Sequence, residues 1–558
     1  MGSKHELEGK YNPKDFEERI YEDWEKNGYF KPSDDRSKEP YTIVIPPPNI
    51  TGKLHMGHAL DETIQDILIR YKRMEGYNVK FTTGLDEHGL KIETKAIEAG
   101  KTPQEYVDEM AKNAINLWEK LNISQHDFIR TTNQKHEEIV LKIYEKMCNN
   151  GDIYKGHYSG WYCVPCETFF TKTQLVDGKC PDCGREVNLT EEECYFFNIK
   201  KYQSKIEEFY EKNPNFLEPV FRKEEIMNNF IKPGLEDLCI SRTTFSWGIK
   251  LPNDPKHVIY VWLDALTNYI TSLGYLTEND SEFKSFWPAD IQIIGKDIVR
   301  FHAIYWPIFL MSLGIDTPKK LYSHGFIVMK DGKMSKSKGN MIYPDVLADK
   351  FGVDAVRYFL LKLMNYGTDS EFTPETFVER YNSDLCNDLG NLLNRTIAMI
   401  NKYFNGEIDN SFKEKTDYDE EIENVVKDSI NNFKNDFEKI YISNSLSNLF
   451  NLITKANKYI DQTEPWILAK SEENHEKLKS VMYHLVENLR IFAIYINPFI
   501  PDTSKNILDQ LGIEEQYRTL ESAMYGACNS TKVIEKGIPL FQRLDVEETT
   551  NEIKEMMK

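Results

Sequence analysis

A junction between a strand and a helix near the start of the chain carries two histidines. The segment Tyr41-Thr-Ile-Val-Ile45 is apolar and β-branched, which predicts a buried strand, and the three prolines after it end that strand. Helical spacing of apolar residues begins at Met56 and includes Leu60, Ile64, Ile67, Leu68 and Tyr71. His55 and His58 are therefore expected on one side of the first helical turn.

A junction of this kind can bind phosphate. The N–H groups at the start of a helix attract anions, and Gly57 allows a nucleotide to approach the backbone closely. Two other interpretations fit the same residues, because the histidines could cap the helix or bind a metal ion. The block His55-Met-Gly-His58 alone does not choose among the three.

A second segment, past the middle of the chain, concentrates positive charge beside glycines. It contains Lys330, Gly332, Lys333, Lys336, Lys338 and Gly339. Like charges this close repel each other unless an anion such as a triphosphate lies between them. A flexible, exposed loop is the alternative interpretation of the same composition.

Together and in this order, the blocks His55-Met-Gly-His58 and Lys333-Met-Ser-Lys-Ser337 resemble the ATP signature of class I aminoacyl-tRNA synthetases. The resemblance implies that His55 and His58 contact the reacting phosphate, and that Lys333 and Lys336 close over the pyrophosphate from a mobile loop. It also implies ATP contacts, with Mg²⁺ accompanying ATP, from Gly57, His324, Gly325, Met334, Ser335 and Ser337.

The chemistry agrees with these residue types. An amino-acid carboxylate has a pKa of about 3.5 and is ionised at neutral pH, so its attack on a phosphate needs no general base. The site must align the reactants and stabilise the charge that develops on the phosphates, which histidine and lysine donors can do.

Four of the nine cysteines form two C-x-x-C pairs, Cys163-Val-Pro-Cys166 and Cys180-Pro-Asp-Cys183. Two such pairs separated by a short turn predict one tetrahedral structural Zn²⁺ held by Cys163, Cys166, Cys180 and Cys183. A redox pair and two disulfides are the alternatives. With four thiolate ligands the predicted zinc would keep no open position for catalysis.

Longer strings resemble methionyl-tRNA synthetases, from about Thr82 to Asp545. They include Glu193-Cys-Tyr-Phe-Phe-Asn, Asn228-Asn-Phe-Ile-Lys-Pro-Gly, Tyr260-Val-Trp-Leu-Asp-Ala265, Gly295-Lys-Asp-Ile-Val-Arg-Phe-His302 and Glu464-Pro-Trp466. The resemblance implies ligation of methionine to tRNA through an adenylate. It places the amino acid among Asp86, Trp262, Ala265, Tyr269, Ile298 and His302. A carboxylate can pair with the substrate ammonium, and aromatic residues can surround a thioether, although such aromatics are more often ordinary core.

The beginning of the chain departs from that pattern. The stretch Ile45–His55 and the segment Gln65–Tyr77 resemble valyl-tRNA synthetases. Pro47 and Asn49 then stand where methionyl enzymes place apolar and aromatic residues against the amino acid. The enzyme could use methionine through an altered pocket, charge valine or another amino acid, or tolerate methionine-like inhibitors. A paralogue that binds RNA without catalysis is a further alternative.

Editing argues against valine. A binding pocket favours one of two amino acids that differ by a single methylene only about 10- to 200-fold. Synthetases for small aliphatic amino acids therefore carry a large domain that hydrolyses wrong products. The predicted insertion, residues 117–227, is too short to hold such a domain beside the cysteine pairs.

Apolar residues recur at helical spacing from about Phe377 to Gly512, which predicts a helix bundle. The resemblance makes this bundle the anticodon-binding domain, with contacts from Asn387, Asn391, Arg395 and Trp466. Aromatic residues stack on unpaired RNA bases, which suits Trp466. The alternative is that Thr463 caps a helix and Trp466 simply packs.

The predicted fold class is α/β: a doubly wound Rossmann-type parallel sheet split by a zinc-knuckle insertion, followed by an all-α anticodon-binding helix bundle. The expected parts are the first catalytic half (1–116), the insertion (117–227), the second catalytic half (228–325), a linker fold with the lysine loop (326–376), the helical domain (377–545) and a charged tail (546–558).

Charge and hydrophobicity limit which molecules the protein can bind and where it can be found. The 558 residues carry a net charge of −20, which argues against non-specific nucleic-acid binding but not against a shaped tRNA site. The longest apolar run, near Ala303–Ile315, is interrupted by Pro307 and is shorter than the roughly 20 residues that span a bilayer. We therefore expect a cytoplasmic protein, without membrane contact, whose partners are ATP, methionine and tRNA. The short end of the chain leads us to expect a monomer.

Overall fold

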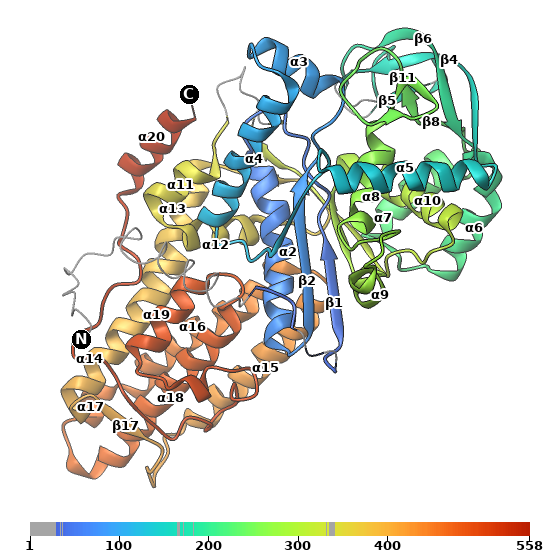
Figure 1. The fold of residues 1–558 in the computed structure, drawn as a ribbon. Coiled ribbons are helices and arrows are strands. Elements are labelled where there is room, and N and C mark those ends of the chain that lie inside the picture. The colour runs from blue at the N-terminus through green and yellow to red at the C-terminus, as the bar shows by residue number, and fades with distance from the viewer. Residues whose placement is uncertain are drawn as a thin grey trace, which may run out of the picture.

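The computed structural model describes residues 30–33, 35, 37–164, 168–170, 172–181, 184–330, 332–333 and 341–557. A parallel sheet and its helices stand between a small antiparallel sheet at one end and a group of long helices at the other (Figure 1). Among the described residues, no helix has the length and apolarity needed to cross a lipid bilayer.

Two groups of parallel strands form the central sheet. β1 (Pro40–Val44), β2 (Asn78–Leu85) and β3 (Asp127–Arg130) pair in the order β1-β2-β3. β12 (Gln292–Gly295), β13 (Leu321–His324) and β7 (Leu217–Glu218) pair in the order β12-β13-β7. A single parallel bridge between Ile43 and Ile291 joins the groups edge to edge. The strand order therefore reverses between β1 and β12, where ligands bind in sheets of this type.

The predicted junction at the first strand is confirmed. β1 is apolar and buried from Thr42 onward, and α2 (Met56–Met74) begins directly after the proline-rich turn. The apolar residues expected on one helix face are buried, and α2 packs against β1, β2 and β12. The other helices of the α/β part are α3 (Leu90–Glu98), α4 (Pro103–Lys120), α5 (Gln134–Asn149), α6 (Gln203–Lys212), α7 (Val220–Ile226), α8 (Val261–Thr271), α9 (Ser281–Phe286) and α10 (Trp306–Leu313).

An antiparallel sheet of order β5-β4-β6-β8 forms the insertion. Its strands are β4 (Ile153–Cys163), β5 (Thr168–Phe170), β6 (Asn188–Phe197) and β8 (Leu238–Cys239). Beside it lie β9 (Ser241–Arg242), β10 (Lys250–Leu251) and β11 (Asp254–Ile259). The boundaries predicted for the insertion, 117–227, therefore need correction. β3 and β7 lie inside that range but belong to the parallel sheet, whereas β8 to β11 lie beyond it and pack with the insertion.

The segment after the central sheet forms a small sheet and two helices. β14 (Ile327–Met329) pairs with β15 (Gly332–Lys333) and with β16 (Ser370–Glu371). α11 (Pro344–Phe351) and α12 (Val353–Leu363) follow, and α12 packs on α2.

The predicted helix bundle is confirmed. Its helices are α13 (Pro374–Arg380), α14 (Asn391–Phe404), α15 (Asp419–Glu438), α16 (Ile442–Thr463), α17 (Pro465–Leu468), α18 (His475–Ile496) and α19 (Pro501–Gln510). A ten-residue π-helix, η8 (Tyr381–Gly390), joins α13 to α14. A short ladder between β17 (Glu407–Asp409) and β18 (Ser530–Lys532) closes one side. The segment expected only as a charged tail forms α20 (Val546–Met556), which packs on α13 because Thr549, Thr550 and Ile553 are buried.

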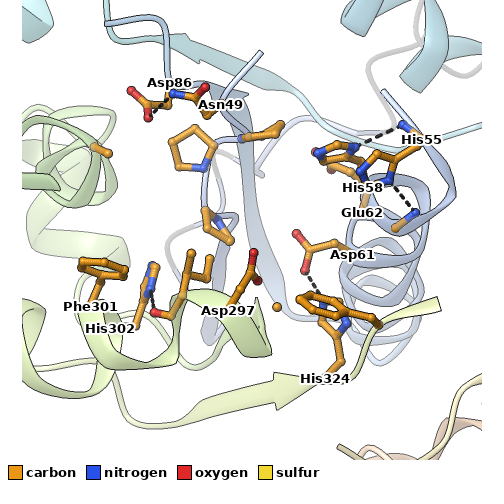
Figure 2. Close-up of a pocket in the computed structure, with 18 of the residues that line it drawn as sticks. Asn49, His55, His58, Asp61, Glu62, Asp86, Asp297, Phe301, His302 and His324 are labelled. Carbon is orange, nitrogen blue, oxygen red and sulfur yellow. Dashed lines mark hydrogen bonds and ion pairs between the residues drawn. The ribbon is translucent and has the colours of Figure 1, made fainter. Parts of the chain in front are cut away.

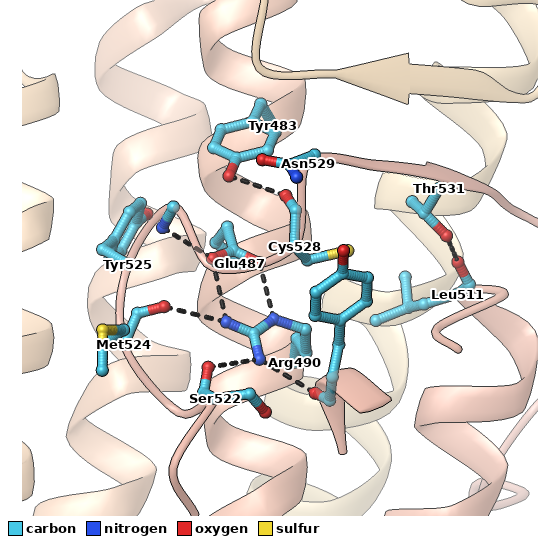
Figure 3. Close-up of polar contacts among 12 residues, drawn as sticks. Tyr483, Glu487, Arg490, Leu511, Ser522, Met524, Tyr525, Cys528, Asn529 and Thr531 are labelled. Atoms are coloured by element: carbon cyan, nitrogen blue, oxygen red, sulfur yellow. Dashed lines mark hydrogen bonds and ion pairs between the residues drawn. The ribbon is translucent and has the colours of Figure 1, made fainter. Parts of the chain in front are cut away.

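A buried ion pair fixes the chain that follows the bundle (Figure 3). Arg490 on α18 pairs with Glu487 one turn earlier, and both side chains are fully buried. The Arg490 guanidinium donates to the carbonyl oxygens of Tyr517, Ser522 and Met524, and the backbone N–H of Gly526 donates to Glu487. One charged pair thereby satisfies the backbone groups of a loop that has little regular structure.

Candidate active site

One pocket, of about 410 Å³, lies where the strand order reverses, beside the ends of β1, β2, β12 and β13 (Figure 2). Residues predicted from five separate stretches of sequence line it together. They are Pro47, Asn49, His55, Gly57, His58, Asp86, Trp262, Ala265, Tyr269, Ile298, His302, His324 and Gly325. Figure 2 shows the histidines of α2 facing Phe301 and His302 across the pocket.

The two histidines of α2 both cap the helix and line the pocket. The His55 Nδ1 accepts from the backbone N–H of Gly57 at 3.1 Å, and the His58 Nδ1 accepts from the backbone N–H of His55 at 3.1 Å. Burial, aided by His55, holds the pKa of His58 well below its ordinary value. Because Nδ1 of each ring accepts, the proton of each neutral ring lies on Nε2.

Asp86 lies directly after β2 and is held by the proline-rich turn. The Asp86 backbone N–H donates to the Pro48 carbonyl at 3.1 Å, and the Asn49 amide donates to the Asp86 carboxylate at 3.1 Å. Asp86 is only 6% exposed, so its carboxylate forms a nearly buried anionic end of the pocket. Asn49, which departs from the methionyl pattern, thus contacts the residue expected to bind the ammonium group.

The apolar end of the pocket is built on α8 and on the π-helix η6 (Phe301–Tyr305). Trp262 stacks on Phe301, with ring centroids 3.7 Å apart. The Tyr269 hydroxyl lies 2.6 Å from the His302 Nε2, and the His302 Nδ1 lies 2.9 Å from the Ile298 carbonyl. Burial lowers the pKa of His302 to about 4, so the ring is neutral at pH 7. Its Nδ1–H donates to the carbonyl, and its Nε2 accepts from Tyr269.

Two acidic residues of α2 line the pocket although the sequence analysis did not name them. Asp61 contacts the His324 Nε2 at 3.0 Å, and burial raises the pKa of Asp61 despite this contact. Burial raises the pKa of Glu62 well above its ordinary value, and the Thr83 hydroxyl donates to Glu62 at 2.6 Å. Their positions three and four residues after His58 could have indicated them, because those positions share a helix face.

Other lining residues were also missed. They are Pro46, Pro48, Lys91, Trp118, Arg185, Leu266, Gly295, Asp297, Phe301, Phe326 and Ile327. Asp297 and Phe301 lie inside a string that was already singled out, so spacing from Ile298 and His302 could have suggested them. Arg185 comes from the cysteine-containing insertion, and no local signal in the sequence places it at this pocket.

Most of the lysine block lies outside the described residues, including Met334, Ser335, Lys336 and Ser337, and only the backbone of Lys333 is described. The flanks of this segment are placed beside the pocket. Phe326, directly before β14, and Ile327, its first residue, both line the pocket. After the segment, Asp345 pairs at 2.7 Å with Lys53, two residues ahead of His55. The described flanks of the lysine block therefore lie on the same side of the molecule as the histidine junction.

The cysteine pairs are described in part, because Cys166 and Cys183 lie outside the described residues. Cys163 and Cys180 are buried and share a small cluster with Phe170 and Val187. The Gly184 N–H donates to the Cys180 carbonyl at 2.8 Å, and the Cys180 N–H donates to the Arg185 carbonyl at 2.9 Å. These two bonds hold Gly184 and Arg185 close to Cys180.

A separate group with metal-ligand chemistry lies on the insertion, at Glu193, Asp254 and His257. The Lys155 ammonium contacts both carboxylates, at 3.0 and 2.6 Å, and Lys256 contacts Glu193 at 2.5 Å. The lysines already neutralise the carboxylates, so the group is better explained as an ion-pair network.

The predicted anticodon residues lie on η8, α14 and α17 of the helical domain. Asn391 and Arg395 are exposed on α14, and Arg395 pairs at 3.5 Å with Asp461 near the end of α16. Asn387 lies in η8, next to α16. Trp466 on α17 is 42% exposed, which fits a stacking surface better than core packing. The alternative cap does not form, because the Thr463 hydroxyl donates back to Tyr459 within α16.

Comparisons with known families cover most of the chain. Residues 41–191 and 183–397 match a family model described as tRNA synthetases class I (M). Residues 411–555 match a model described as the anticodon binding domain of methionyl tRNA ligase.

Individual relatives agree with the family models. The chain is 50% identical over 521 residues to the methionine–tRNA ligase of Bacillus subtilis (strain 168), which covers 91% of this chain and 78% of the relative. The methionine–tRNA ligase of Halalkalibacterium halodurans is 49% identical over 535 residues, or 93% of this chain and 81% of that protein.

Two solved structures of the Mycobacterium tuberculosis methionyl-tRNA synthetase have similar folds. The form bound by methionyl-adenylate has a TM-score of 0.86 at 38% identity, covering 90% of this chain and 100% of the other. The free form has a TM-score of 0.78 at 35% identity, covering 91% and 99%.

Proposed function

The chain belongs to the class I methionyl-tRNA synthetases, and we propose that it joins methionine to tRNA through a methionyl-adenylate formed in the pocket described above. In the first step a carboxylate oxygen of methionine bonds to the α-phosphorus of ATP, and the bond to pyrophosphate breaks. In the second step a terminal ribose hydroxyl of tRNA attacks the acyl carbon, and AMP leaves. Neither step requires a protein nucleophile, so positioning and charge stabilisation carry the catalysis.

The phosphates would lie at the start of α2. His55 and His58 would donate from Nε2 to phosphate oxygens, aided by the helix N-terminus, and Gly57 would let the phosphates approach the backbone. Lys333 and Lys336 would close over the pyrophosphate, with further ATP contacts from His324, Gly325, Met334, Ser335 and Ser337. The Lys53–Asp345 pair supports this arrangement, because it ties the flank of the lysine segment to the histidine junction. Mg²⁺ would accompany ATP.

Methionine would lie between the anionic and apolar ends of the pocket. Asp86 would bind the ammonium group, with its carboxylate oriented by Asn49. Trp262, Ala265 and Ile298, together with Pro47, would contact the side chain. Tyr269 and His302 would lie beside the thioether, a polarisable group that packs well on aromatic edges. Because the altered turn still contacts Asp86, the departure at Pro47 and Asn49 is compatible with methionine as substrate.

A structural Zn²⁺ fits the insertion. Cys163, Cys166, Cys180 and Cys183 would hold it, and the backbone bonds of Cys180 with Gly184 and Arg185 suit a zinc knuckle. The metal would supply no chemistry to the reaction and would hold the knuckle that carries Arg185 to the pocket.

The helical domain would read the tRNA anticodon. Trp466 would stack on a base, and Asn387, Asn391 and Arg395 would donate to base edges or phosphates. The exposure of Trp466 and the proximity of Arg395 to the end of α16 support a shared surface.

The observation that carries the proposal is the meeting of the predicted nucleotide and amino-acid residues in one pocket. The test is ATP–pyrophosphate exchange with methionine, valine, leucine and isoleucine in turn, followed by charging of methionine tRNA. We expect exchange with methionine far above the other three. Exchange with valine alone would contradict the methionine assignment, and exchange with none would favour an RNA-binding protein without catalysis.

A further inference from the structure

A buried carboxylate behind the amino-acid pocket bridges two histidines. Asp264 lies on α8, on the side turned away from the pocket-lining residues Trp262 and Tyr269. One of its oxygens lies 2.6 Å from the His88 Nδ1, and the other lies 2.7 Å from the His136 Nε2. Asp264, His88 and His136 are each at most 3% exposed, so water does not compete for these contacts.

The bridge includes a buried ion pair. Burial alone would lower the pKa of His88, but the charge of Asp264 and hydrogen bonds to Asp264 and Glu137 raise it to about 10. Burial alone would raise the pKa of Asp264, but the two histidines lower it to about 2. At pH 7 the bridge therefore contains a cationic His88 and an anionic Asp264. Removing one charge of such a pair leaves the other uncompensated in the interior.

His88 belongs to the strand end that carries Asp86. Between these residues, Glu87 accepts from the Arg130 guanidinium at 2.8 Å, and the Trp247 indole N–H donates to the Glu87 carbonyl at 2.7 Å. Three consecutive side chains after β2 are thus held from different directions. Of these, His88 is the one bonded to α8, which carries the apolar wall of the pocket.

His136 belongs to α5 and reaches α8 at a second point. Its Nδ1 lies 2.6 Å from the Thr271 hydroxyl, two turns beyond Asp264 on the same helix. Two contacts along α8 fix the rotation of that helix about its axis. This rotation determines where Trp262, Ala265 and Tyr269 point.

We infer that Asp264 is a positioning residue for the amino-acid subsite: through His88 and His136 it sets the distance between the Asp86 carboxylate and the apolar wall on α8. This inference rests on the proposed function. Methionine must contact both ends at once, so a small error in their separation weakens its binding. The phosphate donors on α2 take no part in the bridge, so ATP binding is insensitive to it.

The test uses Asp264→Asn, which keeps the size of the side chain. The amide carries no charge, so the ion pair with the cationic His88 is lost, and its donor group must face one of the two histidines. In pyrophosphate exchange we expect the KM for methionine to rise roughly 10- to 100-fold, the scale that small misplacements cause, while the KM for ATP changes less than about threefold. Active sites are counted by the adenylate formed in a single turnover, so misfolded protein is excluded from both constants.

The matched control is Asp152→Asn. Asp152 is fully buried in the same part of the molecule and accepts from Tyr202 at 2.8 Å and Ser312 at 2.7 Å, but it does not line the pocket. We expect this variant to lose thermal stability with an unchanged KM for methionine. His88→Gln, which keeps the Asp264–His136 contact, serves if Asp264→Asn fails to fold, and its KM should change in the same direction.

An unchanged KM for methionine per active site in Asp264→Asn, or an equal rise in the control, would overturn the inference. Both results would leave the wild-type exchange with methionine intact. Absence of that exchange in the wild type would instead contradict the proposed function.

Discussion

At the scale of single residues, the position of the ring proton of His302 determines which hydrogen bonds form at the apolar end of the pocket. His302 donates from Nδ1 to the Ile298 carbonyl, so its Nε2 needs a donor, which Tyr269 supplies. In Tyr269→Phe the buried acceptor loses that donor, at a cost of about 1–3 kcal/mol. We expect the KM for methionine to rise roughly 10-fold in pyrophosphate exchange, with little change in the KM for ATP.

Tyr210→Phe is the matched control for this prediction. The Tyr210 hydroxyl is also buried and donates to the Ala303 carbonyl at 2.8 Å, but Tyr210 does not line the pocket. Its loss should lower the free energy of unfolding without affecting the KM for methionine. Equal effects of the two substitutions on KM would show that the Tyr269–His302 contact has no special role.

At the scale of elements, the segment that holds Cys180 and Arg185 links metal binding to the pocket. We expect the purified protein to contain about one Zn²⁺ per chain, and Cys163→Ser to lose it, because serine is a poor ligand for this metal. The Arg185 carbonyl accepts from the Cys180 N–H, and Arg185 lines the pocket, so loss of the metal should also reduce exchange activity. Metal content by atomic absorption and the exchange rate are measured on the same sample.

Cys148→Ser is the control, since Cys148 lies on α5 outside the two C-x-x-C pairs. It should retain both metal and activity. Full zinc content in Cys163→Ser would contradict the proposed ligand set.

Local sequence patterns predicted the helices and strands that local interactions determine. They did not predict the strands that form only by pairing with distant segments. The strand before His55, the helix after it and the long bundle helices all follow from apolar spacing. In contrast, β3 has four residues and β7 has two, so neither shows a usable pattern, and only pairing with distant strands identifies them. The β17–β18 ladder joins residues about 120 positions apart, which no local signal indicates.

The pocket was predictable in the same uneven way. The residues predicted to contact methionine or ATP line the pocket wherever their side chains are described, because most of them follow the strand ends that meet there. Residues such as Trp118 and Arg185 enter from elements whose approach depends on the tertiary fold. Side-chain networks behind the wall, such as the one at Asp264, depend on contacts between three elements and leave no spacing signal.

At the scale of the whole molecule, one arginine holds the catalytic and helical parts together. Arg357 on α12 is fully buried and pairs at 2.6 Å with Asp66 on α2. It also donates to the carbonyls of Leu121, Pro498 and Phe499. In Arg357→Met, Asp66 loses a buried partner, so we expect the free energy of unfolding to fall by about 3–5 kcal/mol in urea titrations.

Arg380→Met provides the comparison. Arg380 is 46% exposed and lies 3.6 Å from Asp384, so its loss should change the free energy of unfolding by at most about 1 kcal/mol. A similar small change in Arg357→Met would mean that the apolar contacts between α2 and α15, such as Tyr71 with Phe437, carry the interface without the ion pair.

The capping contacts at the start of α2 have a consequence for any kinetic measurement on this site. The rings that present N–H groups to the pocket also prevent the first turn from unwinding, through the bonds at Nδ1. An alanine in place of His55 or His58 removes a ligand donor and also loosens the end of the helix. The measured loss of rate would therefore overstate the chemical role of the imidazole. At the N-cap, His55, asparagine is a strong cap without an imidazole and separates the two effects.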